Sequence, residues 1–122
     1  MHTMLRVKDL DESIRFYTEQ LGMHVLRRMS DGDGKSIAFI GYGSEDENAV
    51  LELQHSASKI EFVRGEFFGH LAIGVPDAHK TFAALCQSGA KSLREPRLKD
   101  DEVIASIEDP NGYKIELIEV RA

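Results

Sequence analysis

The sequence predicts an α+β protein built from two βαβββ modules with mixed sheets. Segments in which apolar and polar residues alternate, as in half-buried strands, are interrupted twice by a segment with helical spacing. In addition, residues 2–10 (HTMLRVKDL) align without a gap with residues 70–78 (HLAIGVPDA). A module of ~60 residues buries too little surface alone. We therefore expect the two modules to pair with a second copy.

The first module is expected to span residues 1–54. Met1–Val7 alternates as a strand and starts almost at the first residue. A helix follows, with Asp9 as its N-cap and Gly22 as the glycine that ends it. The three remaining strands are expected at residues 24–29, 36–41 and 49–54.

Residues 55–68 are interpreted as a connector, and residues 69–122 as the second module of a single domain covering 1–122. A strand at 69–75 precedes a helix that is capped by Asp77 and ended by Gly89. The pattern then predicts strands at 90–95, 103–107 and 112–120, with a charged loop at 96–102. The last strand follows Asp109-Pro110-Asn111-Gly112, which is a turn sequence.

Composition excludes several classes of function. The formal charge of −6 argues against general affinity for nucleic acid, whose phosphates require a basic surface. We find no apolar run of the ~18 residues that a membrane span requires and no signal segment. The single cysteine, Cys86, has no internal disulfide partner and fits a reducing compartment. These features lead us to expect a cytoplasmic protein that acts on a small molecule.

Each module carries a histidine at the start of its first strand and a glutamate in its last. His2 and Glu52 occupy these places in the first module, and His70 and Glu116 in the second. A lone residue of either type is more often packed or solvent-exposed than a ligand. Because all four lie opposite aliphatic stripes and recur in both modules, we interpret them as ligands of one divalent metal ion.

The remaining polar candidates are weaker. Arg6 shares a strand face with His2 and could anchor an anionic substrate, or could equally pair with a surface acid. Three histidines lack a counterpart in the other module and are interpreted as structural or surface residues: His24, His55 and His79.

Nearly the whole chain resembles the glyoxalase I family (lactoylglutathione lyases) of the vicinal oxygen chelate superfamily. The motifs that carry the resemblance are HTMLRVKDLDESIRFYTEQLGM, FIGYG, VLEL, GHLAIGV and EDPNGYKIELIE. The resemblance implies a glyoxalase/bleomycin resistance-like fold whose cupped sheet is completed across a homodimer with shared active sites. It also implies a divalent metal ion held by His2, Glu52, His70 and Glu116. A histidine at the first of these positions is similar to the nickel-preferring type, with Co²⁺ and Zn²⁺ as alternatives.

The activity implied by this resemblance is isomerisation of the hemithioacetal of methylglyoxal and glutathione to S-lactoylglutathione through an enediolate. Glu116 is expected to be the principal base, assisted by Glu52. Arg6 matches the family's arginine that contacts the glutamyl carboxylate of glutathione. Gln54 and Ser56 stand where the family often has a threonine and an asparagine that hold glutathione. The use of another thiol therefore stays open.

Three other functions occur on the same fold. An epimerase acting on a CoA thioester shares the proton-abstraction chemistry, but resembles these motifs less and often has glutamine where Glu52 stands. A ring-cleaving dioxygenase needs a two-histidine, one-carboxylate site, and Glu52 would be a fourth ligand. A non-enzymatic drug-binding resistance protein would favour an aromatic-lined groove, whereas this chain has no tryptophan.

Overall fold

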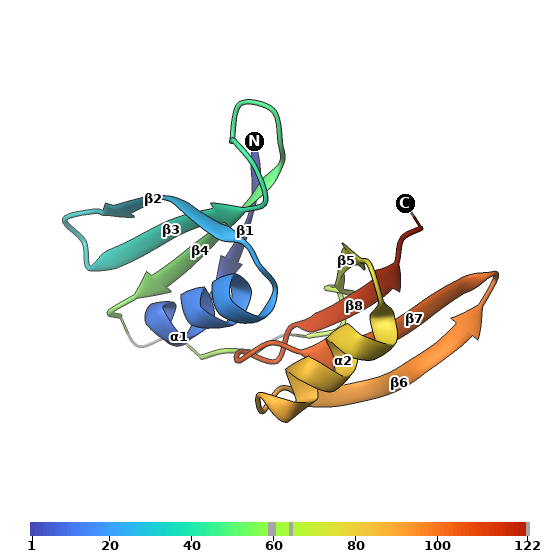
Figure 1. The fold of residues 1–122 in the computed structure, drawn as a ribbon. Coiled ribbons are helices and arrows are strands. Elements are labelled where there is room, and N and C mark those ends of the chain that lie inside the picture. The colour runs from blue at the N-terminus through green and yellow to red at the C-terminus, as the bar shows by residue number, and fades with distance from the viewer. Residues whose placement is uncertain (59–60, 64, 122) are drawn as a thin grey trace. The chain divides into compact units, whose positions relative to one another are not determined.

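The computed structural model describes residues 1–58, 61–63 and 65–121. The chain divides into two compact units, Met1–Val63 and Arg64–Ala122. Each unit consists of a four-stranded mixed sheet and a helical segment that follows the first strand (Figure 1). The predicted α+β architecture with two βαβββ modules is therefore confirmed.

In the first unit the sheet has the strand order β1-β4-β3-β2. The outer pair β1 and β4 is parallel, and the other two pairs are antiparallel. The elements are β1 (His2–Arg6), α1 (Leu10–Arg15), η1 (Phe16–Gln20), β2 (His24–Ser30), β3 (Lys35–Gly41) and β4 (Val50–Ser56). Strand β4 continues two residues beyond the end expected at residue 54, because His55 and Ser56 pair with β3.

The first helix begins as expected and then changes its winding. Asp9 is the N-cap, and its carboxylate accepts a hydrogen bond from the amide of Glu12 at 3.0 Å. After α1 the chain continues as the π-helical turn η1, where the hydroxyl of Thr18 donates to the carbonyl of Ile14 at 2.7 Å. Adjacent Phe16 and Tyr17 are both buried in this wider turn. The sequence predicted one uninterrupted helix over this segment.

The second unit repeats the arrangement with the strand order β5-β8-β7-β6, and β5 is parallel to β8. Its helix carries Asp77 as N-cap, as expected. The elements are β5 (Leu71–Val75), α2 (Ala78–Gln87), β6 (Lys91–Lys99), β7 (Glu102–Glu108) and β8 (Lys114–Glu119).

The prediction of a charged loop at 96–102 is wrong, because β6 continues through Pro96 to Lys99. Proline has no N–H to donate, but β6 is the edge strand of its sheet and carries two register shifts, one of them between Arg94 and Arg97. The hairpin turns instead at Asp100 and Asp101, whose φ angles are 49° and 66°. Two positive φ angles are typical of a two-residue hairpin turn, which aspartate tolerates.

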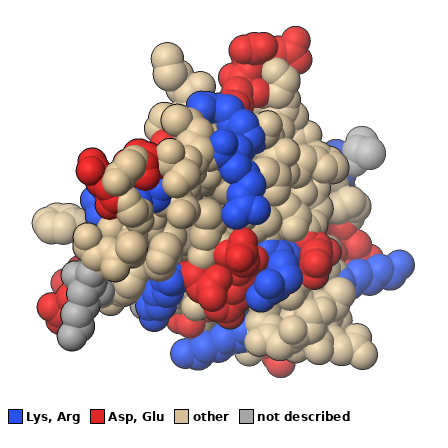
Figure 2. Space-filling model, turned by 90° about the vertical axis from the view of Figure 1, so that its left-hand side faces the viewer, with Lys and Arg blue, Asp and Glu red and all other residues tan. Residues whose placement is uncertain are grey.

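The core of each unit lies between the sheet and its helix. Leu5 and Leu53 pair in register and are 3% and 0% exposed. Ile115 and Leu117 on β8 are fully buried. No helix among the residues that the structure describes is long and apolar enough to cross a membrane. Basic and acidic side chains are interspersed on the face drawn in Figure 2.

Candidate metal centre

The first candidate pair lies on the face of the first sheet that is turned away from α1. Strand alternation puts Leu5 and Leu53 against the helix, so His2 and Glu52 point to the other side. The Nε2 atom of His2 lies 3.3 Å from Oε1 of Glu52. The side chain of Glu52 is 13% exposed and that of His2 is 43% exposed. The imidazole is thus accessible at the surface while the carboxylate is largely enclosed.

His2 is held at the beginning of β1 by the sheet itself. Its Cα pairs with that of Val50 in the parallel ladder, and the Val50 amide donates to the carbonyl of Met1 at 3.2 Å. The backbone of the chain start is therefore tied to β4 at the point where the candidate ligand is needed.

The second candidate pair has the same geometry in the second unit. His70 immediately precedes β5, and its Nε2 atom lies 3.6 Å from Oε2 of Glu116 on β8. In each unit, the glutamate pairs with the residue two positions after the histidine: Met4 pairs with Glu52, and Ala72 with Glu116. The sequence repeat is thus also a repeat of side-chain geometry.

Each pair fits a single divalent ion. Two donor atoms bonded to one ion at about 2.0–2.2 Å stand roughly 3 Å apart when the bonds are at right angles, and somewhat further apart in a tetrahedron. The observed separations of 3.3 and 3.6 Å fall in this range. Imidazole nitrogen and carboxylate oxygen together suit borderline cations such as Zn²⁺, Ni²⁺ or Fe²⁺. Each unit thus supplies two of the four predicted ligands.

The predicted substrate-binding residues lie on strands of the first unit. Arg6 pairs in register with Gln54, on the same face as His2 and Glu52. Ser56 lies at the end of β4, where its hydroxyl accepts a hydrogen bond from the amide of Ser58 at 3.3 Å. Ser56 is four residues from Glu52 on β4, so alternation places it on the same face. Arg6 and Ser56 thus both belong to the strand face that carries the first candidate pair.

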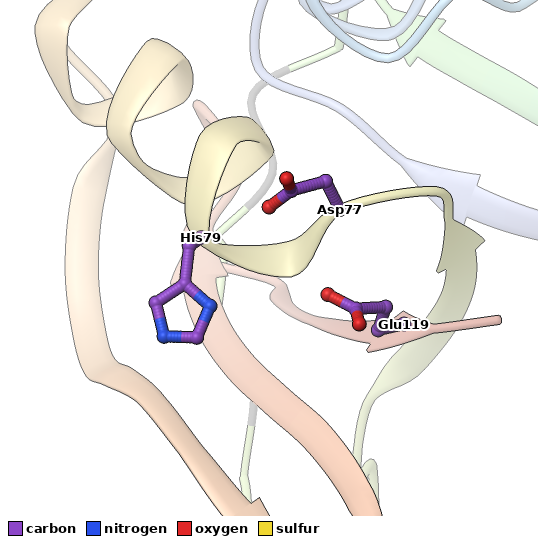
Figure 3. Close-up of side chains that lie close together, drawn as sticks. All are labelled: Asp77, His79 and Glu119. Atoms are coloured by element: carbon purple, nitrogen blue, oxygen red, sulfur yellow. The ribbon is translucent and has the colours of Figure 1, made fainter. Parts of the chain in front are cut away.

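A cluster that the sequence did not predict lies at the start of α2. Ligand atoms of Asp77, His79 and Glu119 all lie within 4.8 Å of one another, with Glu119 reaching from β8 toward the helix (Figure 3). Both carboxylates already have a structural role. Asp77 accepts from the amide of Lys80 at 2.9 Å, and Glu119 from that of Ala78 at 3.0 Å. We interpret the cluster as a double cap of the helix N-terminus.

The other two histidines are also accounted for. His24 is exposed at the beginning of β2. His55 is half-buried, with Nδ1 at 3.3 Å from the carbonyl oxygen of Val7. Their assignment as structural or surface residues stays a prediction.

A cavity of about 320 Å³ lies on the helix side of the first sheet. His55 and Ser36 line it from the strands, and Arg28 and Asp11, which also line it, form an ion pair at 3.3 Å. Because His55 alternates with Gln54 along β4, this cavity is on the face opposite to His2 and Glu52. It is therefore separate from the candidate metal centre.

Comparison with known proteins found a matching family, similar curated proteins and similar solved structures. The family described as the Glyoxalase/Bleomycin resistance protein/Dioxygenase superfamily matches residues 1–117. A protein of Synechocystis sp. named probable lactoylglutathione lyase is 47% identical over 98% of this chain and 93% of its own length.

Two solved structures resemble the whole chain. Glyoxalase I from Zea mays has a TM-score of 0.92 and 37% identity over 99% of this chain, which spans only 44% of the maize chain. The trypanothione-dependent glyoxalase I of Leishmania major has a TM-score of 0.87 and 39% identity, over 97% of this chain and 84% of its own.

Proposed function

The chain belongs to the glyoxalase/bleomycin resistance protein/dioxygenase superfamily, and we propose that it is a lactoylglutathione lyase (glyoxalase I). As such it is an enzyme of the carbon–sulfur lyase class, supported by relatives of that name along nearly its whole length. The reaction is isomerisation of the hemithioacetal of methylglyoxal and glutathione to S-lactoylglutathione. The observation that carries this proposal is the His–Glu pair, found with the same strand geometry in both units.

His2, Glu52, His70 and Glu116 are the residues that would hold the divalent ion. When bound, this ion supplies Lewis-acid stabilisation of negative charge on the substrate oxygens. Two imidazoles and two carboxylates are compatible with Ni²⁺, Co²⁺ or Zn²⁺, and we favour Ni²⁺ because the first position is a histidine.

The two glutamates supply the acid–base chemistry. Glu116 takes the proton from the carbon that bears sulfur, which leaves an enediolate, and returns it to the neighbouring carbon. The hydroxyl proton passes from the first oxygen to the second, so that the thioester carbonyl and the new hydroxyl form. Glu52, its counterpart in the repeat, assists. The side chains are 13% and 21% exposed, so both carboxylates remain within reach of a substrate at the sheet face. Their rigid strands fix the direction from which the proton is removed.

We assign the binding of the thiol part of the substrate to the first unit. Arg6 is suited to bind the glutamyl carboxylate of glutathione, beside Gln54 and Ser56. Thiol choice differs among relatives, since the Leishmania major enzyme is described as trypanothione-dependent. Glutathione is our first choice, and another thiol is the alternative.

We further propose that the active protein is a cytoplasmic homodimer. In this arrangement His2 and Glu52 of one chain would meet His70 of the partner subunit and Glu116 of the partner subunit. A half-buried pair in each unit would then become part of a four-ligand centre. A reducing compartment suits the free Cys86.

Turnover by reconstituted protein tests this proposal. Metal-free protein is loaded with Ni²⁺, Co²⁺ or Zn²⁺ and assayed with methylglyoxal and glutathione or trypanothione, by following thioester formation. We expect Glu116→Gln to lower kcat at least ~100-fold, as for loss of a general base. The absence of turnover with every combination of metal and thiol would refute the assignment.

Glu119→Gln is the matched control on the same strand. Glu119 lies on the opposite face of β8 from Glu116 and accepts the amide of Ala78 at 3.0 Å. Glutamine retains that acceptor, so kcat should stay within about twofold of the parent. Equal losses in both variants would indicate damage to β8 rather than loss of the base.

A further inference from the structure

A row of side chains crosses the first sheet beside His2. Arg27 on β2 pairs in register with Phe39 on β3, and Phe39 pairs with Glu52 on β4. All three therefore lie on the face that carries His2. The ring of Phe39, which is 3% exposed, meets the imidazole of His2 edge-on with centroids 5.4 Å apart and an interplanar angle of 77°. The buried ring of Phe39 thus provides a fixed contact surface for the imidazole of His2.

The guanidinium of Arg27 lies on the same phenyl ring, with its Cζ 3.8 Å from the ring centroid. It is held there by Glu45, in the segment between β3 and β4. Nε of Arg27 donates to Oε2 of Glu45 at 2.8 Å, and Nη2 donates to Oε1 at 3.1 Å. This bidentate pairing fixes the plane of the guanidinium as well as its position.

We propose that Arg27 and Glu45 are positioning residues for His2. Their ion pair holds the guanidinium on Phe39, and the immobilised ring in turn keeps the imidazole of His2 directed at Glu52. The importance of this support for a metal centre rests on the assignment of His2 and Glu52 as metal ligands, whereas the orientation of the His2 ring does not. It gives the ion pair a role in the centre, although neither Arg27 nor Glu45 is a ligand.

The exposure of His2 explains why such support is needed. Its side chain is 43% exposed and loses rotamer freedom when it is held in one orientation. The pKa of Arg27 is raised, first by the hydrogen bond to Glu45 and further by the charges of Glu45 and Glu52. This direction agrees with the bidentate ion pair between Arg27 and Glu45. Groups outside the ligand set commonly orient metal-binding histidines by direct hydrogen bonds. Here the contact with His2 would be made through the ring of Phe39.

The first test follows His2 by NMR in metal-free full-length protein with labelled histidine. In the parent, the ring current of Phe39 should displace the His2 ring resonances from their random-coil positions. In Arg27→Gln and Glu45→Gln, we expect these resonances to move toward random-coil positions and to report faster side-chain motion. Arg27 and Glu45 are 47% and 30% exposed, so both variants should fold.

Arg28→Gln is the matched control, because Arg28 is the next residue of β2 and points to the opposite face. It too forms an ion pair, with Asp11 at 3.3 Å. Its replacement should leave the His2 resonances in place. Unchanged His2 resonances in both Arg27→Gln and Glu45→Gln would overturn the proposal.

The second test measures Co²⁺ binding by visible absorption. We expect the dissociation constant to rise about tenfold in Arg27→Gln and in Glu45→Gln, and to stay within twofold in Arg28→Gln. Unaltered Co²⁺ affinity in the first two variants would contradict the role in the metal centre. If the parent bound no Co²⁺ while His2 still lost order in the variants, the metal assignment would fail and the positioning role would stand.

Discussion

Replacing Asp109 by alanine should destabilise the turn that leads into β8, the strand that carries Glu116. The carboxylate of Asp109 accepts hydrogen bonds from the backbone amides of Asn111 and Tyr113, each at 2.8 Å, and from the Asn111 side chain at 3.2 Å. Asp109 is 5% exposed. Alanine would therefore leave these amides in a partly buried place without their acceptor.

The structure sets the size of this effect. Losing the acceptor of two partly buried amides costs about 1–1.5 kcal/mol for each one, or roughly 2–3 kcal/mol in total. For a chain of this size, 1 kcal/mol corresponds to roughly 4 °C in melting temperature. Asp109→Ala should therefore melt about 8–12 °C below the parent, as measured by circular dichroism or calorimetry.

Asp31 provides an internal comparison with the same hydrogen-bond pattern. In the turn between β2 and β3, its Oδ1 accepts the amides of Asp33 at 3.0 Å and Lys35 at 3.2 Å. Asp31 is exposed, so water can replace its carboxylate. Asp31→Ala should lower the free energy of unfolding by less than about 1 kcal/mol. Equal shifts in the two variants, or a shift under about 2 °C for Asp109→Ala, would refute the argument from burial.

Three further predictions concern a helix N-cap, an ion pair and the glycine at a helix end. Glu119→Ala should cost about 1 kcal/mol in chemical denaturation, because the amide of Ala78 loses its acceptor; no loss would contradict the capping role. The hydrogen bond from Arg27 holds the pKa of Glu45 below its usual value. Stabilisation by this pair should therefore be complete above pH about 4.3 and lost as pH falls further. When the free energy of unfolding is measured by urea titration across this pH range, Glu45→Gln should lack this part of the pH dependence. The same pH dependence in Glu45→Gln and in the parent would contradict the prediction. Gly22→Ala should lower the free energy of unfolding by about 1 kcal/mol, because φ is 74° at this helix end and alanine is strained there. A melting temperature equal to that of the parent would contradict this prediction.

The two modules, their order of elements and the faces of the strands that carry the candidate ligands could be predicted from the sequence. Alternation with a period of two fixes which side chains share a face, whatever the strand packs against. Leu53 and Leu117 were thereby placed in the core, and both are fully buried. The same reasoning put Glu52 and Glu116 on the opposite faces, each within 3.6 Å or less of a histidine. These features are local, so a repeated pattern was sufficient to predict them.

Features that depend on which strands become neighbours could not be predicted from the sequence and follow only from the fold. Pro96 continues β6 because that strand is at an edge, and no local pattern says which strand will be one. The contact of Arg27 with Phe39 needs the register of β2 on β3, and its ion pair with Glu45 needs the path of the following loop. Such contacts join residues that are distant in sequence, and each side chain alone resembles an ordinary surface or core residue. Only the folded structure gives the distances that distinguish these side chains from ordinary surface or core residues.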